Sequence, residues 1–163
     1  MINLKKITIT SDNMKDCIAL DVAPHKEDFV NTNAITLAGA YEYNADGIVA
    51  ECRAIYADGN MVGLIAYNYY VGDPVFKETC YRIRPVMVDS NHQGKGYEEA
   101  ALQKLLEEIR TKPHGEATAI FATYDPEEED MAKLYESMGF AKTNMDWKDE
   151  DPDDNDIIVR MSL

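Results

Sequence analysis

Cysteine and histidine are too few and too scattered in this chain to build a disulfide framework or a metal site. The three cysteines, Cys17, Cys52 and Cys80, are odd in number, far apart and never in a CxxC pair, which excludes a disulfide scaffold and a zinc ribbon. The three histidines are equally dispersed, and no HExxH motif occurs. We therefore expect no metal, and a reducing compartment such as the cytoplasm.

Long apolar runs and basic residues are also scarce. No stretch approaches the roughly 18 to 20 apolar residues that span a bilayer, and Met1–Lys6 do not open a signal peptide. The chain holds 16 Lys and Arg against 30 Asp and Glu, a formal net charge of −14. Nucleic acid would repel this charge and no basic stripe offsets it. The sequence predicts a protein that binds neither nucleic acid nor membrane.

What the chain does have is material for one core. Its 163 residues are 45% hydrophobic, which suits a single domain over residues 1–163. The excess acid is concentrated, because residues 125–156 hold 13 acidic and 3 basic side chains. Within them, the acidic loop 149–156 carries a proline and no apolar residue, which predicts a solvated hairpin tip.

Hydrophobic periodicity predicts a mixed α/β order. Strands are expected at 4–9, 48–70 with a turn at Asp58-Gly59-Asn60, 78–88, 118–124, 140–147 and 156–162. Helices are expected from Ser11 or Asp12 to Leu20, at 33–42, at 96–111 and from Asp125-Pro126 to Gly139. This order predicts a mixed sheet with helices on its faces.

The segment with the clearest chemistry is Val86–Tyr97, where a strand leads through a glycine turn directly into a helix. Glycines at 94 and 96 allow a ligand to approach backbone amides at the start of the helix, an arrangement that suits phosphate oxygens. The third glycine of a dinucleotide fingerprint is replaced by Glu99, and no P-loop occurs. Taken alone, Gly-Lys-Gly is more typical of a plain surface turn than of a phosphate site.

The turn, the downstream Leu134-Tyr135 pair and the element order together resemble the GNAT superfamily of N-acetyltransferases over essentially the full chain. The resemblance implies an α/β fold with a mixed, splayed sheet of about six to seven strands, helices on both faces, and acetyl-CoA as co-substrate. It implies a cofactor site formed by Val86, Met87, Val88, Gln93, Gly94, Lys95, Gly96, Tyr97, Glu98 and Glu128. The chain departs from the family pattern at Asn91, where Gln or Arg is usual, at Glu98, where a small residue is frequent, and at Glu128, where Asn is frequent.

The resemblance also assigns roles in amine acetylation. Strand amides at Val86–Val88 would hold the pantetheine arm and polarise the acetyl oxygen, next to Pro85, which removes a ladder donor and favours a bulge. Tyr135 would be catalytic, protonating the departing thiolate as general acid. The alternative interpretations are that Pro85 merely ends a ladder and that Tyr135 is a buried aromatic.

The acceptor side gives a weaker signal. Residues 21–41 are similar to the helical entry region of bacterial spermine/spermidine acetyltransferases of the PaiA and BltD type, with Lys26 where Gln is common. This predicts a polyamine site at Glu27, Asp28, Tyr41 and Glu42, whose carboxylates and aromatic face suit an elongated cation. The alternatives are another small amine, such as an amino acid or an antibiotic-like amine, a protein amino group, or a degenerate CoA-binding or interaction protein without turnover. The segment itself is alternatively a solvated connection between two helices. No base is singled out, and a homodimer is an expectation from the family.

Overall fold

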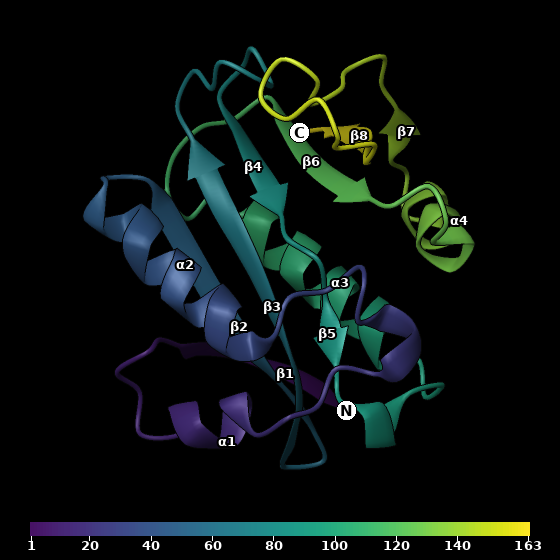
Figure 1. The fold of residues 1–163 in the computed structure, drawn as a ribbon. Helices are drawn as coiled ribbons and strands as arrows, with labels where there is room; N and C mark the ends of the chain where they lie inside the picture. Colours follow the sequence, from purple (N-terminus) through teal and green to yellow (C-terminus); the bar gives the residue numbers. More distant parts are fainter.

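An eight-stranded mixed sheet runs through the molecule (Figure 1). The structure is a computed structural model and describes residues 1–163. The strands are β1 (Ile2–Ile7), β2 (Val49–Ala57), β3 (Asn60–Tyr70), β4 (Cys80–Ile83), β5 (Met87–Val88), β6 (Ala119–Tyr124), β7 (Ala141–Lys142) and β8 (Ile157–Ser162). Their order is β1-β2-β3-β4-β6-β8-β7, with β5 paired to β3. Only β4 and β6 are parallel, and helix α3 (Tyr97–Arg110) lies between them in the chain.

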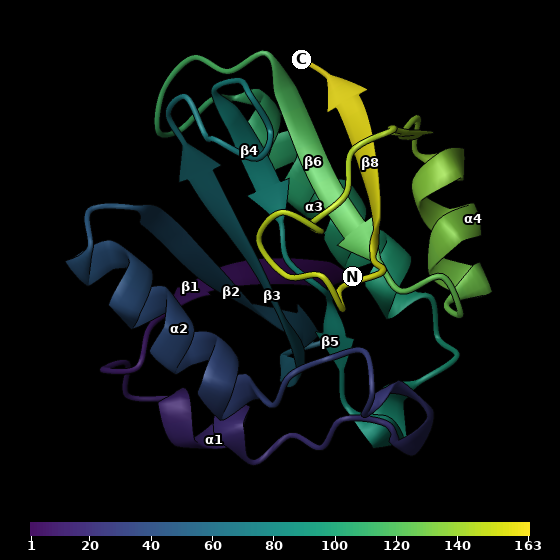
Figure 2. The same ribbon diagram turned by 45° about the horizontal axis from the view of Figure 1, so that its top comes forward.

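Helices cover both faces of the sheet, as expected (Figures 1 and 2). On one face, α3 and α4 (Glu129–Ser137) contribute Leu102 and Tyr135 to the main core, where they join Ile65 of β3. On the other face, α1 (Met14–Ile18) and α2 (Asn33–Ala45) form a second core with Leu64 of the same strand. Successive residues of a strand point to opposite faces, so these two cores lie on the two sides of one sheet.

Several local predictions are confirmed. Helix α2 begins after Thr32, whose hydroxyl accepts a hydrogen bond from the amide of Ile35 at 3.5 Å. Asp58 and Gly59 both have positive φ, +49° and +85°, which is the tight primed turn of a hairpin. Gly139, at φ +98°, follows the end of α4.

Other boundaries differ from the prediction. Strand β1 begins at Ile2 and ends at Ile7, and α1 is limited to Met14–Ile18. Helix α4 begins at Glu129 rather than at Pro126, because Asp125 closes a turn first: its side chain accepts from the Glu127 amide at 2.8 Å and its carbonyl accepts from the Glu128 amide at 2.9 Å.

The strand expected at 140–147 is reduced to β7, because the chain leaves the sheet after Lys142. Met145 and Trp147 instead pack over a third core around Phe76 and Phe121. The predicted acidic loop therefore begins earlier than residue 149, and it lies over the sheet face that carries α1 and α2.

The strand predicted at 78–88 is broken in two, and the break splays the sheet. Tyr67 of β3 pairs with Ile83, and Leu64 of β3 pairs with Met87. From the first pair to the second, β3 advances by three residues and the opposite segment by four. One extra residue at the Arg84–Val86 step is a β-bulge, placed at Pro85. Beyond it β5 pairs with β3 alone, while β6 continues along β8 (Figure 2). The edge of β5 that faces β6 is therefore unpaired.

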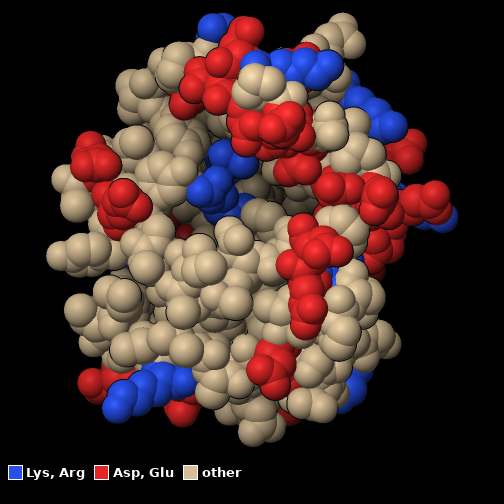
Figure 3. All heavy atoms as spheres, viewed as in Figure 1, with Lys and Arg blue, Asp and Glu red and all other residues tan.

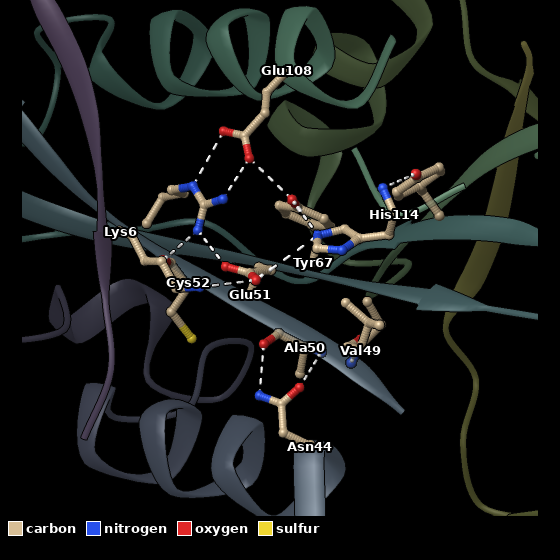
Figure 4. Close-up of polar contacts among 12 residues, drawn as sticks. Lys6, Asn44, Val49, Ala50, Glu51, Cys52, Tyr67, Glu108 and His114 are labelled. Carbon is tan, nitrogen blue, oxygen red and sulfur yellow. Dashed lines mark hydrogen bonds and ion pairs between the residues drawn. The ribbon is translucent and has the colours of Figure 1, made fainter. Parts of the chain in front are cut away.

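A partly buried polar network fixes α3 against the sheet (Figure 4). Arg53 of β2 donates to Glu108 of α3 at 2.6 Å and to Glu51 at 2.7 Å, and Tyr67 of β3 donates to Glu108 at 3.0 Å. His114 lies 3.2 Å from the Tyr67 hydroxyl. These contacts anchor the carboxyl-terminal half of α3, the helix whose amino terminus forms the site described next.

Candidate active site

The glycine turn presents a run of unused backbone donors. Between the short helix η2 (Ser90–His92) and the body of α3, the seven N–H groups of residues 93–99 have no acceptor in the protein. Gly94 and Gly96 both have φ +75°, and a Cβ added at either would meet no atom within 4 Å. Unpaired amides at a helix start favour an anion, and the space in front of the glycines leaves room for one. We call residues 93–99 the amide cradle.

The side chain of Gln93 links the amide cradle to the preceding strand. Its Nε2 donates to the Val88 carbonyl at 2.7 Å, which ties the turn to the end of β5. A hollow of about 340 Å³ separates the cradle from α4 and is lined by Gly94, Gly96 and Glu98 on one side and Leu134 on the other. The structure thus brings together the predicted residues of strand, turn and helix start. Val86, Met87 and Val88 are buried, and Lys95 and Tyr97 lie at the cradle itself.

A buried lysine lies beside Glu98 and Glu128. These are the two predicted cofactor residues whose negative charge does not suit a phosphate site. Lys26 of η1 (Pro24–Lys26) contacts Asp130 at 2.9 Å and Glu128 at 3.4 Å. Burial alone would lower the pKa of Lys26, but the hydrogen bond to Asp130 and the charges of Glu98 and Glu128 outweigh it and raise that pKa. Burial raises the pKa of Glu98 and of Glu128. Lys26 therefore offsets the acids that the sequence places beside the cradle.

This position of Lys26 corrects a prediction. The sequence placed Lys26 in the acceptor-side segment, at the position where the resembled acetyltransferases commonly have Gln. In the structure it is 7% exposed, and it joins η1 to the start of α4. The partner residues are more than 100 positions away along the chain, so no local pattern indicates this contact.

Tyr135 lies on the inner face of α4 with its hydroxyl unsatisfied. The side chain is 1% exposed, and the hydroxyl has no hydrogen-bond partner. Its ring stacks on Tyr124 of β6 at 6.2 Å and meets Phe140 edge-on at 5.2 Å. Burial raises the pKa of Tyr135, and the charges of Glu128 and Glu98 raise it further. The phenol is therefore protonated at neutral pH, and a buried donor without a partner is expected to serve a group outside the chain.

A second hollow, the acceptor cavity, opens on the α2 side of the sheet with a volume of about 360 Å³. It reaches the splay at Pro85 and Thr123. Glu27 and Asp28, two of the residues predicted on the acceptor side, line it and are exposed at its rim. Tyr41 and Glu42 do not line it: Tyr41 is 65% exposed and borders a separate hollow beside β1 and β2. Tyr43 is the aromatic residue of α2 that reaches the acceptor cavity.

Sequence reasoning missed three charged residues of this cavity. Arg82 and Arg84 line it from β4 and the residue after it, and Asp156 lines it from the acidic loop. In Figure 3 basic atoms lie inside the hollow between α2 and the carboxyl-terminal loops, with acidic side chains on its margin. The signal available was the spacing Arg82-x-Arg84, which puts both arginines on one face of a strand. Asp156 gave none, because its loop has the composition of a solvated segment.

Two wider features of the structure bear on function. None of the helices has the length and apolar character that crossing a bilayer requires. No three His, Cys, Asp or Glu side chains converge as ligands of a metal ion.

Comparisons with known proteins agree with this geometry. The family model described as the acetyltransferase (GNAT) family matches residues 16–140, whereas no curated protein matches the chain. A GNAT family acetyltransferase from Elizabethkingia anophelis with acetyl-CoA bound has 16% identity and a TM-score of 0.65, over 99% of this chain and 98% of its own. The PaiA N-acetyltransferase of Thermoplasma acidophilum in complex with coenzyme A has 11% identity and a TM-score of 0.68, over 100% and 99%. An acetyltransferase from Thermus thermophilus has 11% identity and a TM-score of 0.69, over 100% and 97%.

At these identities the solved structures show a shared fold, and the family model carries the assignment. A splayed mixed sheet beside an amide cradle defines, as a class, an acetyl-CoA-dependent N-acetyltransferase. The chain belongs to the acetyltransferase (GNAT) family.

Proposed function

We propose that this enzyme transfers the acetyl group of acetyl-CoA to a primary amine held in the acceptor cavity. The observation that carries the proposal is the run of seven unpaired amides at residues 93–99, facing open space at Gly94 and Gly96. These donors fit a pyrophosphate, since oriented N–H groups and the helix dipole both favour its charge. The unpaired edge of β5 at Val86–Val88 fits the amide groups of a pantetheine arm and the acetyl oxygen.

Acetyl-CoA, when bound, supplies an activated thioester, and the chain supplies the proton transfers. The amine nitrogen forms a bond to the acetyl carbon while the carbon–sulfur bond breaks. Tyr135 would donate its phenolic proton to the leaving sulfur, a role that its buried and unpartnered hydroxyl supports. The raised pKa keeps the phenol protonated at neutral pH, so its proton is available when the carbon–sulfur bond breaks.

Asp156 is the residue that we propose as the proton acceptor for the amine. It lines the acceptor cavity, and burial together with Asp154, Asp125 and Glu128 raises its pKa to about 6, against an opposing effect of Arg82. The carboxylate is therefore ionised at neutral pH, yet basic enough to take a proton from an ammonium through water. The acidic loop then belongs to the site rather than to a passive hairpin tip.

A polyamine such as spermidine or spermine is the acceptor suggested by the sequence, and Glu27 and Asp28 at the rim of the cavity support it. The other two predicted residues, Tyr41 and Glu42, do not. The arginines inside the cavity also repel a polycation. The proposal therefore extends only to a primary amine as acceptor, and a polyamine is one candidate to be tested. We further propose that the enzyme works in the cytoplasm, where its three free, buried cysteines would stay reduced.

The rival function is a CoA-binding protein without turnover, and the half-buried Glu98 and the buried Glu128 near the cradle favour it. Calorimetry with acetyl-CoA, followed by thiol release with a panel of amines, separates the two. We expect micromolar or tighter binding and release of thiol only when an amine is present. Binding without release for every amine would support the rival, and no binding would refute the role of the cradle.

A further inference from the structure

The floor of the acceptor cavity carries two arginines on one face of the sheet. Arg82 lies in β4 and Arg84 two residues later, before the bulge at Pro85. The guanidinium of Arg82 lies over the ring of Trp147 at 4.7 Å. That of Arg84 donates to the Tyr43 hydroxyl at 3.0 Å and lies 5.2 Å from the ring of Tyr43. Aromatic rings and a phenol therefore hold both groups in position without neutralising them.

Neither arginine forms an ion pair, although the charge of Arg82 does act on Asp156. None of the ion pairs of the protein includes Arg82 or Arg84, and the Nε of Arg82 is buried without any hydrogen-bond partner. Burial and the neighbouring charge of Arg84 lower the pKa of Arg82, as expected for like charges removed from water. Both arginines are partly buried, and a partly buried charge without an ion-pair partner is costly, so two adjacent ones that line a cavity indicate an anion that binds there.

The other charged residues that line the cavity are acidic. Glu27 and Asp28 are exposed at the rim, and Asp156 is half-buried along the wall. The cavity thus combines a basic floor with acidic margins, as Figure 3 shows. A polycation would have to enter toward two fixed positive charges, whereas a molecule with charges of both signs matches both parts.

We propose that the acceptor is an amine that also carries a carboxylate, such as an amino acid, and that Arg82 and Arg84 bind the carboxylate. This inference rests on the proposed function, because it names the acceptor class for the same cavity. Guanidinium groups bind carboxylates through paired, charge-assisted hydrogen bonds. The volume of about 360 Å³ suits a ligand of amino-acid size. With the carboxylate on the floor, the ammonium group lies within a cavity walled by Asp156, the proposed proton acceptor.

Matched acceptors that differ only in the carboxylate test this proposal. The pairs are L-phenylalanine with phenethylamine, L-lysine with cadaverine and 4-aminobutyrate with propylamine, with spermidine as the polycation. We expect kcat/KM to favour at least one of the acids over its decarboxylated partner by about tenfold or more, the discrimination that a charge-assisted pair provides. Equal use of all pairs, or preference for the amines, would overturn the proposal.

The variant Arg84→Gln tests whether this arginine binds the carboxylate of the acceptor. Its side chain is half-buried, and its hydrogen bond and its aromatic contact are both to Tyr43, so the fold should survive. Arg84→Lys retains the charge without the fork, and Arg110→Gln removes an exposed arginine on α3 as a control. We expect Arg84→Gln to lower kcat/KM for the preferred acid by about tenfold or more. The kcat/KM for its decarboxylated partner should change by less than about threefold, and the kcat/KM for spermidine should rise. An unchanged ratio of acid to amine would refute the arginine subsite, and spermidine as the best acceptor would assign the cavity to polyamines.

A binding measurement keeps this test independent of turnover. Calorimetry of the same acids into the enzyme with coenzyme A reports the subsite even if no acceptor is acetylated. Loss of acid binding in Arg84→Gln without turnover on any amine would support the subsite and refute the proposed reaction. Turnover on amines without any effect of Arg84 would support the reaction and refute the subsite.

Discussion

Replacing Gly96 with alanine should weaken acetyl-CoA binding far more than it weakens the fold. Gly96 is the N-cap of α3 with φ +75°, and a Cβ there meets no protein atom within 4 Å. An alanine forced into the left-handed region costs about 1 to 2 kcal/mol. For a domain of this size the melting temperature should then fall by roughly 2 to 8 °C.

The effect on binding has a different origin. The space that the new methyl group would occupy is the space through which a pyrophosphate reaches the amides of residues 93–99. Losing one charge-assisted hydrogen bond costs about 1.5 to 3 kcal/mol, which corresponds to an increase in Kd of about tenfold to a hundredfold. Titration calorimetry with acetyl-CoA measures this change directly.

Gly47 provides a matched control. It has φ +81°, a Cβ there also meets nothing within 4 Å, and it lies in the turn between α2 and β2. Gly47→Ala should therefore show the same loss of melting temperature with unchanged acetyl-CoA affinity. If Gly96→Ala and Gly47→Ala change the affinity equally, or not at all, the assignment of the amide cradle to the cofactor is wrong.

Two further predictions concern proton transfer. Tyr135→Phe keeps the ring stacked on Tyr124 and removes only the unpartnered hydroxyl, so kcat should fall by about 10² to 10⁴ with little change in acetyl-CoA affinity; near-parental turnover would mean that another group protonates the sulfur. Asp156→Asn should abolish the rise of activity with pH through about 6 and raise the melting temperature at pH 7. The folded state holds this proton more tightly than the unfolded chain does, so the carboxylate destabilises the fold as pH rises from about 4 to about 6; a melting temperature that falls in the variant, or a pH profile that is unchanged, would contradict this reasoning.

The parts of the fold that were predictable depend on local physical chemistry. The Asp58-Gly59 hairpin, the Thr32 cap and the buried stripe of α3 at Leu102 and Leu105 follow from turn conformation, capping and helical spacing. The amide cradle was predictable for the same reason, since a glycine turn between strand and helix leaves its amides free wherever it occurs.

The acceptor side was not predictable, because no single segment forms it. Its cavity lies between α2, β4 and a loop more than 70 residues further along the chain. Tyr43 rather than Tyr41 reaches it, because two steps along a helix turn the side chain to another face. The composition of the acidic loop predicts a solvated Asp156, whereas in the structure Trp147 packs against Phe76 and holds this loop over the third core. The sequence shows that Asp156 is charged, but it does not show which part of the sheet its loop packs against.

The contact of Lys26 with Glu128 and Asp130 has a consequence for the order of folding. It joins residues 102 and 104 positions apart, and closing a loop of that length costs entropy that only the folded intervening sheet repays. We therefore expect the pair to form late in folding, when the amino-terminal end of α4 docks. Interactions absent from the folding transition state act on the rate of unfolding rather than of folding. Removing the Lys26 ammonium is therefore expected to speed unfolding of the helix that carries Tyr135 and to leave the folding rate nearly unchanged.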